Sequence, residues 1–100
     1  MGAEGTAIVD FGPSPGSDRT TVPVTGQAGI LAYPASLAEA WLDATAPATP
    51  DHSPDEHSMA AAGGIGITCQ AIVAGTGFTI VAASSMGPVI GKWNVAWVWN

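Results

Sequence analysis

Positive charge is the scarcest property of this chain. Its 100 residues include only two cations, Arg19 and Lys92, against eight acids, and 10% of the residues are charged, where a typical domain has about 25%. Proteins that follow a phosphate backbone or bind anionic lipid need many lysine and arginine side chains. We therefore expect neither a nucleic-acid partner nor a membrane-surface partner.

Cysteine and long hydrophobic runs are scarce as well. Cys69 is the single cysteine, so no internal disulfide is expected. Its place in an apolar alternating segment predicts a small buried side chain with a raised thiol pKa and little reactivity. No apolar run approaches the ~18 residues of a membrane-spanning helix, and the first residues lack the basic and apolar regions of a secretory signal.

Apolar surface, by contrast, is abundant. Hydrophobic residues make up 47% of the chain and the mean hydropathy is +0.31, while the length suits one domain, residues 1–100, with one core. A free monomer normally stays soluble through interspersed charge, and exposed sheet edges are normally guarded by lysine. Because both are scarce here, the sequence predicts that other subunits cover much of the surface. A mildly apolar monomer kept soluble by its acids is the alternative.

Residues 91–100 carry the strongest pattern. Four large apolar residues share one side of an alternating segment: Trp93, Val95, Trp97 and Trp99. Such alternation is typical of a half-buried β-strand, whereas a helical period would scatter the tryptophans around the helix. Because each tryptophan can bury roughly 150–250 Å², we expect this strand to dominate the core and the assembly of the domain.

Several further segments resemble short strands separated by turn residues. They are residues 6–12, 19–25, 28–32, 65–71 and 78–82. Pro23 has no amide hydrogen to donate, which places its strand at a sheet edge or beside a bulge. Residues 36–45 fit either a strand or a capped helix, and we prefer the strand because the all-β surroundings need a partner there. Six to seven short strands predict an all-β fold, an antiparallel β-sandwich, with a partly closed barrel as the alternative.

One short helix is expected over residues 54–61. Ser53 can cap its first turn, Pro54 suits the first helical position, and Asp55 and Glu56 complement the positive end of the helix dipole. The glycine pair at 63–64 would end it.

The segment Asp51-His-Ser-Pro-Asp-Glu-His57 concentrates both histidines and three carboxylates in seven residues. These side chains suit zinc or another divalent transition metal, so the candidate ligands, in a site that two subunits could share, are Asp51, His52, Asp55 and His57. The spacing matches no established metal motif. The preferred alternative is an acidic helix start in which His52 bonds a nearby backbone group, and a pH-sensitive contact is the third.

Catalytic motifs are missing from the sequence. No serine lies in a Gly-x-Ser-x-Gly turn, and neither a Walker A sequence nor Gly-x-Gly-x-x-Gly occurs. We therefore predict that the protein is not an enzyme and needs no cofactor beyond the metal considered above. Trp41 lies outside the terminal strand and is a candidate surface for stacking on sugars, although core packing is the preferred interpretation.

Seven blocks of sequence are spread in order along almost the whole chain: Ala7-Ile-Val-Asp-Phe-Gly12, Pro15-Gly16, Val24-Thr-Gly-Gln-Ala28, Glu39-Ala-Trp-Leu42, Asp51-His52 with Asp55-Glu-His57, Ala74-Gly-Thr-Gly-Phe-Thr-Ile80 and residues 91–99. Together these blocks resemble a family of small tailed-bacteriophage proteins encoded among virion genes. The family has no established activity or binding residues to carry over.

The resemblance implies a bacteriophage virion structural protein, assembled in the cytoplasm of the bacterial host and located in the virion. Capsid decoration or cement is preferred over a tail component. The implied partners are other virion proteins and further copies of the chain, as a homo-oligomer for which a trimer is one option. The alternative function is a tail-fibre or tail-tip module that binds a receptor or glycan through Trp41 and residues 51–57.

Overall fold

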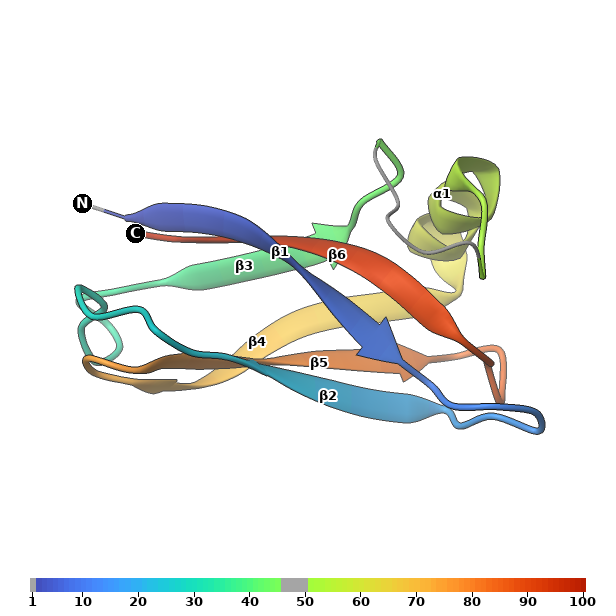
Figure 1. Cartoon of the computed structure of the whole chain (residues 1–100), viewed down its shortest axis with the longest axis horizontal. Helices are drawn as coiled ribbons and strands as arrows, with labels where there is room; N and C mark the ends of the chain where they lie inside the picture. The colour runs from blue at the N-terminus through green and yellow to red at the C-terminus, as the bar shows by residue number, and fades with distance from the viewer. Residues whose placement is uncertain (1, 46–50) are drawn as a thin grey trace.

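Two antiparallel three-stranded sheets pack face to face. The computed structural model describes residues 2–45 and 51–100. One sheet has the order β1 (Ala3–Asp10), β6 (Lys92–Trp99), β3 (Ala38–Leu42), and the other β2 (Arg19–Val24), β5 (Gly77–Ser84), β4 (Ile65–Val73). Figure 1 shows α1 (Pro54–Gly63) at one end of the sandwich and both chain termini at the other. The predicted β-sandwich is confirmed, and the described strands form no closed barrel.

The terminal strand β6 lies in the middle of its sheet, as its aromatic content suggests. Its four alternating residues are all buried, which confirms the predicted pattern: Trp93, Val95, Trp97 and Trp99. Small residues stand beside the last two tryptophans on both neighbouring strands, with Ala3 and Ala38 opposite Trp99 and Gly5 and Ala40 opposite Trp97. Bulky side chains on one strand thus fill the space that alanine and glycine leave on the next.

Strand β3 settles the ambiguous segment 36–45 in favour of a strand. It pairs antiparallel with β6 and buries Leu42. The hydroxyl of Ser36, which a helix would use as its cap, instead accepts a hydrogen bond from the Leu31 N–H at 2.9 Å. Tertiary pairing therefore overrides the helix propensity of the local alanines.

Proline occupies the expected edge position. Pro23 lies in β2, an outer strand of its sheet, opposite Thr79. The carbonyl of Asp18 accepts from Ser84 of β5 at 2.8 Å. Because successive residues of a strand point their backbone groups to opposite sides, position 23 faces the open edge, where a missing N–H breaks no ladder bond.

The strand predicted over residues 28–32 is wrong. This segment forms a turn, and Ile30 is buried. Two isolated hydrogen bonds tie it to the β4–β5 hairpin: Gln27 N–H donates to the Thr76 carbonyl, and Gly75 N–H to the Ile30 carbonyl. The apolar residues thus close one end of the sandwich without joining a ladder.

Helix α1 begins where the sequence predicts and ends two residues later, at Gly63. The Ser53 hydroxyl accepts from the Glu56 N–H at 3.1 Å, and the Glu56 carboxylate accepts from the Ser53 N–H at 2.8 Å, which is a reciprocal capping box. Within the described residues no helix has the length and apolarity needed to cross a bilayer.

Candidate functional site

His57 is the most deeply buried polar side chain of the candidate cluster, with 0% of its surface exposed. Nδ1 lies 2.8 Å from the Ser53 carbonyl, and Nε2 lies 2.9 Å from the Asn94 backbone nitrogen. A carbonyl can only accept and an N–H can only donate. The geometry therefore fits the neutral imidazole with its hydrogen on Nδ1, and it fastens the start of α1 to β6.

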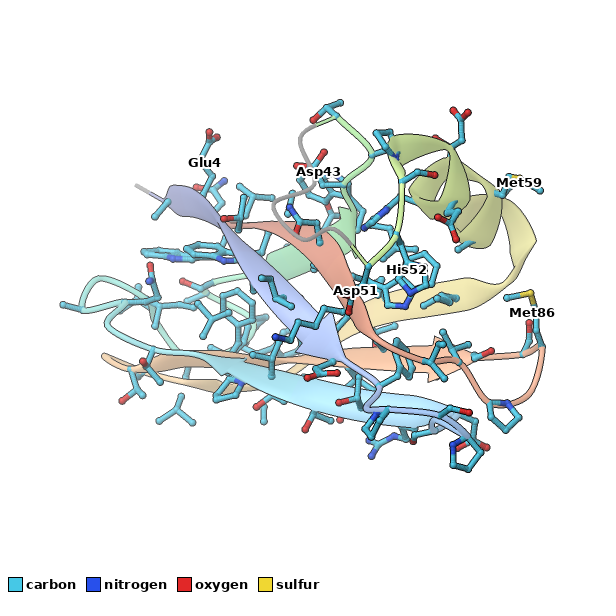
Figure 2. All side chains as sticks on the ribbon, turned by 45° about the vertical axis from the view of Figure 1, so that its right-hand side comes forward. Glu4, Asp43, Asp51, His52, Met59 and Met86 are labelled. Carbon is cyan, nitrogen blue, oxygen red and sulfur yellow. The ribbon has the colours of Figure 1, made fainter. Side chains whose placement is uncertain are left out.

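His52 and Asp51 add a second fastening beside it. The imidazole of His52 stacks on Trp93 with ring centroids 3.6 Å apart, and its Nε2 lies 2.8 Å from the Ile90 carbonyl. A carboxylate oxygen of Asp51 accepts from the Lys92 N–H at 2.9 Å. Figure 2 shows Asp51 and His52 close together near α1. The segment is thus bound to the start of β6 through side chain–backbone contacts.

This arrangement brings three of the four candidate ligands to one place but uses them structurally. Both nitrogens of His57 bond backbone groups, and Asp55 is exposed in the first turn of α1. Within residues 2–45 and 51–100, no group of three or more histidine, cysteine or acidic side chains is arranged to hold a metal ion. Binding a metal through His57 would require breaking one of its hydrogen bonds. The metal site remains a prediction.

Trp41 is on the surface rather than in the core. It is 48% exposed on the outer face of the β1–β6–β3 sheet, beside Ala96 of β6, and Thr6 of β1 lies across from it in the same row. The small neighbours leave a shallow depression over the sheet, whose lining includes Trp41, Glu4, Thr6 and Asp43. An aromatic face with acceptor groups around it can stack on and hydrogen-bond a ligand. A separate depression is lined by Asp51 and His52.

Asp43, at the margin of the Trp41 depression, carries a stabilised negative charge. The Thr45 hydroxyl and backbone N–H both donate to its carboxylate and hold the pKa of Asp43 below its ordinary value of 3.8. Together with Glu4 and Glu39 it makes this face acidic.

The two outer faces differ in charge. Alternation along the strands places Glu4, Asp10 and Glu39 on the outer face of the β1–β6–β3 sheet, with Lys92 opposite Asp10 as the one cation there. The outer face of the β2–β5–β4 sheet carries Arg19 and otherwise neutral residues: Thr21, Pro23, Gly66, Thr68, Gln70, Thr79, Val81 and Ala83. One layer of the sandwich is therefore acidic and the other almost uncharged.

An apolar end is the surface that sequence reasoning missed. Tyr33 is 71% exposed and Leu31 and Leu37 are each 57% exposed, all within the segment that joins β2 to β3. Leu31 and Leu37 line a hollow together with Pro34, Ala35 and Trp99. Both chain termini lie at this end (Figure 1). The available signal was a run of large apolar residues in a turn-rich segment, which local pattern alone assigned to a strand.

The sequence predicts a buried Cys69 with a raised thiol pKa, and the structure confirms the raised pKa but buries the side chain only in part. It lies half-buried in β4, and desolvation, followed by the nearby charge of Glu39, raises the pKa of the thiol to about 11. Because the thiolate is the reactive form, this side chain is poorly suited to nucleophilic chemistry at neutral pH.

Comparison of the chain with protein-family models, with curated proteins and with solved structures found no match.

Proposed function

We propose that this protein is a bacteriophage virion structural protein, a homo-oligomeric β-sandwich subunit that stabilises the particle. The observation that carries the proposal is the apolar end formed by Leu31, Tyr33 and Leu37. Exposed apolar patches on small proteins mark interaction sites, and this chain has few charges elsewhere to keep such a surface soluble. The sequence resemblance to small phage virion proteins points to the same role.

Capsid decoration or cement is preferred over a tail component. The charge is one-sided, with an acidic sheet face and an almost neutral one. This distribution suits a subunit that presents one layer to solvent and lays the other against neighbours. Burial of apolar area at subunit junctions would then strengthen a shell against internal pressure.

The test is co-sedimentation of the purified protein with particles assembled without it. Wild type should bind in a fixed ratio, and Leu31→Ser/Leu37→Ser should weaken binding at least tenfold. The matched control is Met59→Ser/Met86→Ser, because these exposed apolar residues lie at the α1 end (Figure 2). A stable monomer that never binds particles would contradict the proposal. Gold-labelled antibody on intact virions then separates head from tail.

The exposure of Trp41 favours one second candidate, a receptor- or glycan-binding module at the tail fibre or tail tip. Its indole lies open beside Thr6 and a group of carboxylates, which resembles the aromatic and acceptor surface that sugars need. A glycan array with wild type and Trp41→Ala tests it. Binding that is lost in the variant supports this candidate, and no binding by wild type removes it.

A further inference from the structure

The sandwich has four outer strands, and three of them carry features that discourage pairing with another chain. β1 has Glu4 and Asp10, β2 has Arg19 and Pro23, and β3 is only five residues long and includes Glu39. The fourth, β4, spans nine residues with neither a charge nor a proline. Charges, prolines, bulges and short length are the usual guards of a sheet edge, so residues 65–70 of β4, before its irregularity, are the one regular stretch without such a guard among the outer edges of the described strands.

The backbone groups that β4 presents follow from the ladder beside it. Ser84 of β5 donates toward β2, to the Asp18 carbonyl, whereas Ser85 donates toward β4, to the Gly64 carbonyl. Alternation along β5 therefore directs residues 79, 81 and 83 to β4, where they pair with residues 70, 68 and 66. The N–H and C=O groups left at the outer edge belong to Ile65, Ile67 and Cys69.

A groove with a mixed lining, in which Glu39 and Thr68 are the polar members, runs along this edge. It lies between β4 and β3 and is lined by residues 67–69 on one side and 38–41 on the other. Ala38, Ala40, Ile67 and Cys69 are only partly buried against the core. A strand added to β4 would cover these four partly buried apolar side chains and satisfy the edge backbone groups at the same time.

We propose that β4 is a self-association surface, on which β4 of a second copy pairs antiparallel across a two-fold axis. A two-fold contact brings the same strand of both copies together, so a strand that carries charge would meet like charge on its partner and be repelled. With a formal charge of −6 per chain, two copies can approach most closely along a strand that carries no charge of its own, with Glu39 of β3 as the nearest carboxylate. The inference rests on the homo-oligomer of the proposed function and gives dimers or even-numbered assemblies rather than trimers.

The irregularity at the end of β4 selects the register. Pairing with β5 shifts between Gln70 and Val73, and Ala71 has a positive φ of 56°, so the regular edge is confined to residues 65–70. If the two-fold axis passes beside Ile67, the backbone groups of all three outer-edge residues find partners. Ile67 then lies opposite its own copy, and Ile65 lies opposite the partner's Cys69. The same axis also places Gly66 opposite the partner's Thr68. The result is a continuous six-stranded sheet.

Light scattering over a concentration series tests the surface with two matched variants. Thr68 and Thr21 lie in the same row of the same outer face, on opposite edges of the sheet. Thr68→Glu should raise the dissociation constant of the dimer at least tenfold, whereas Thr21→Glu, which changes the net charge equally, should leave it unchanged. An equal effect of both variants would indicate stacking of the faces and overturn edge pairing.

The remaining outcomes separate this inference from the proposed function. An oligomer that Thr68→Glu leaves intact overturns the β4 surface but not the virion role. So does a monomer in solution that still binds particles. A monomer that never binds particles removes both.

Disulfide trapping tests the register. Two variants are made, Gly66→Cys and Thr68→Cys, each also carrying Cys69→Ser. Each variant is oxidised by itself, and a mixture of the two is oxidised in parallel. A Cβ at Gly66 meets no atom closer than the Ala83 carbonyl at 3.9 Å, and facing positions in a non-hydrogen-bonded pair lie about 4.5 Å apart. Cross-links confined to the mixture support the axis at Ile67. Cross-linking of Thr68→Cys alone, or no cross-link in the mixture, overturns that register.

Discussion

The backbone N–H of Asn94 donates a hydrogen bond to Nε2 of His57, 37 residues earlier in the chain, at 2.9 Å. On the other side of the ring, Nδ1 bonds the Ser53 carbonyl. One buried imidazole thus joins the start of the helix to the central strand of a sheet. This cross-link explains why a helix that packs so little of its own surface stays in place.

We expect His57→Ala to lower the free energy of unfolding by about 2–4 kcal/mol, because it leaves a cavity and removes the partner of a buried N–H. Urea unfolding followed by tryptophan fluorescence measures the change. Met59→Ala, on the exposed side of the same helix, is the control and should change stability by less than about 0.5 kcal/mol. Equal stability of the two variants would contradict the cross-link.

Zinc tests the predicted metal site. Since His57 already bonds two backbone groups, we expect added zinc to leave the Tm of wild type unchanged. Calorimetry with and without a chelator makes the comparison. A rise in Tm that disappears in both His52→Ala and His57→Ala would establish the metal site instead.

Acid should destabilise the protein partly through Glu56. Hydrogen bonds from the Ser53 N–H and from His52 hold the pKa of this carboxyl below its ordinary value of 4.5. A lowered folded-state pKa contributes stability above 4.5 that is lost as the pH falls through the folded-state value. Glu56→Gln should therefore lose less stability than wild type below pH 4.5. Urea unfolding at a series of pH values measures the change. If the free energy of unfolding falls equally for the two proteins below pH 4.5, Glu56 does not make this contribution.

Alkylation measures the environment of Cys69. A rise of the thiol pKa from 9.0 to about 11 reduces the thiolate fraction at pH 8 about 100-fold. Iodoacetamide should therefore modify the folded protein at least that much more slowly than the urea-unfolded chain, and the rate should climb as the pH approaches 11. Equal rates in the folded and unfolded states would show that the thiol is neither buried nor perturbed.

Gly5 should tolerate no side chain. A Cβ there would lie 2.5 Å from Cζ2 of Trp97, a buried ring that meets Phe78 edge-to-face. We expect Gly5→Ala to cost about 1–3 kcal/mol through overpacking. Gly66→Ala, where a Cβ would meet only the Ala83 carbonyl oxygen at an ordinary contact distance of 3.9 Å, should be neutral or stabilising by up to about 1 kcal/mol. Chemical denaturation measures the free energy of unfolding of both variants. If Gly5→Ala leaves it unchanged, the indole of Trp97 can move aside.

The parts of the fold that were predictable are those with local signals. The period of two in residues 91–99 and the Ser53–Glu56 capping box are read from neighbouring residues. The exposure of Trp41 could not be predicted in this way. Residues 37–42 alternate, but the pattern does not show which side of the strand faces the core. That choice depends on the partner strand: Trp97 and Trp99 need small neighbours, and Ala38 and Ala40 provide them.

The candidate site was predictable only in part. Composition drew attention to residues 51–57, but the role of His57 depends on Asn94, whose contribution is a backbone N–H and so leaves no trace in the sequence. The turn at 28–32 was misassigned for a similar reason. Its apolar residues resemble those of a strand. The two isolated hydrogen bonds that hold this turn against the β4–β5 hairpin depend on residues distant in the sequence, so local pattern could not reveal them.

The unequal charge of the two sheets gives the molecule a permanent dipole across its thickness. Three carboxylates, Glu4, Asp10 and Glu39, outnumber Lys92 on one broad side, and Arg19 is the lone charge of the strands on the opposite side. Adsorbed on a cationic support such as an anion-exchange resin, the protein should therefore settle with Glu4 and Glu39 downward and its threonine-rich side upward. Immobilisation in that orientation would leave Thr68 and Thr21 accessible to antibodies or proteases from solution.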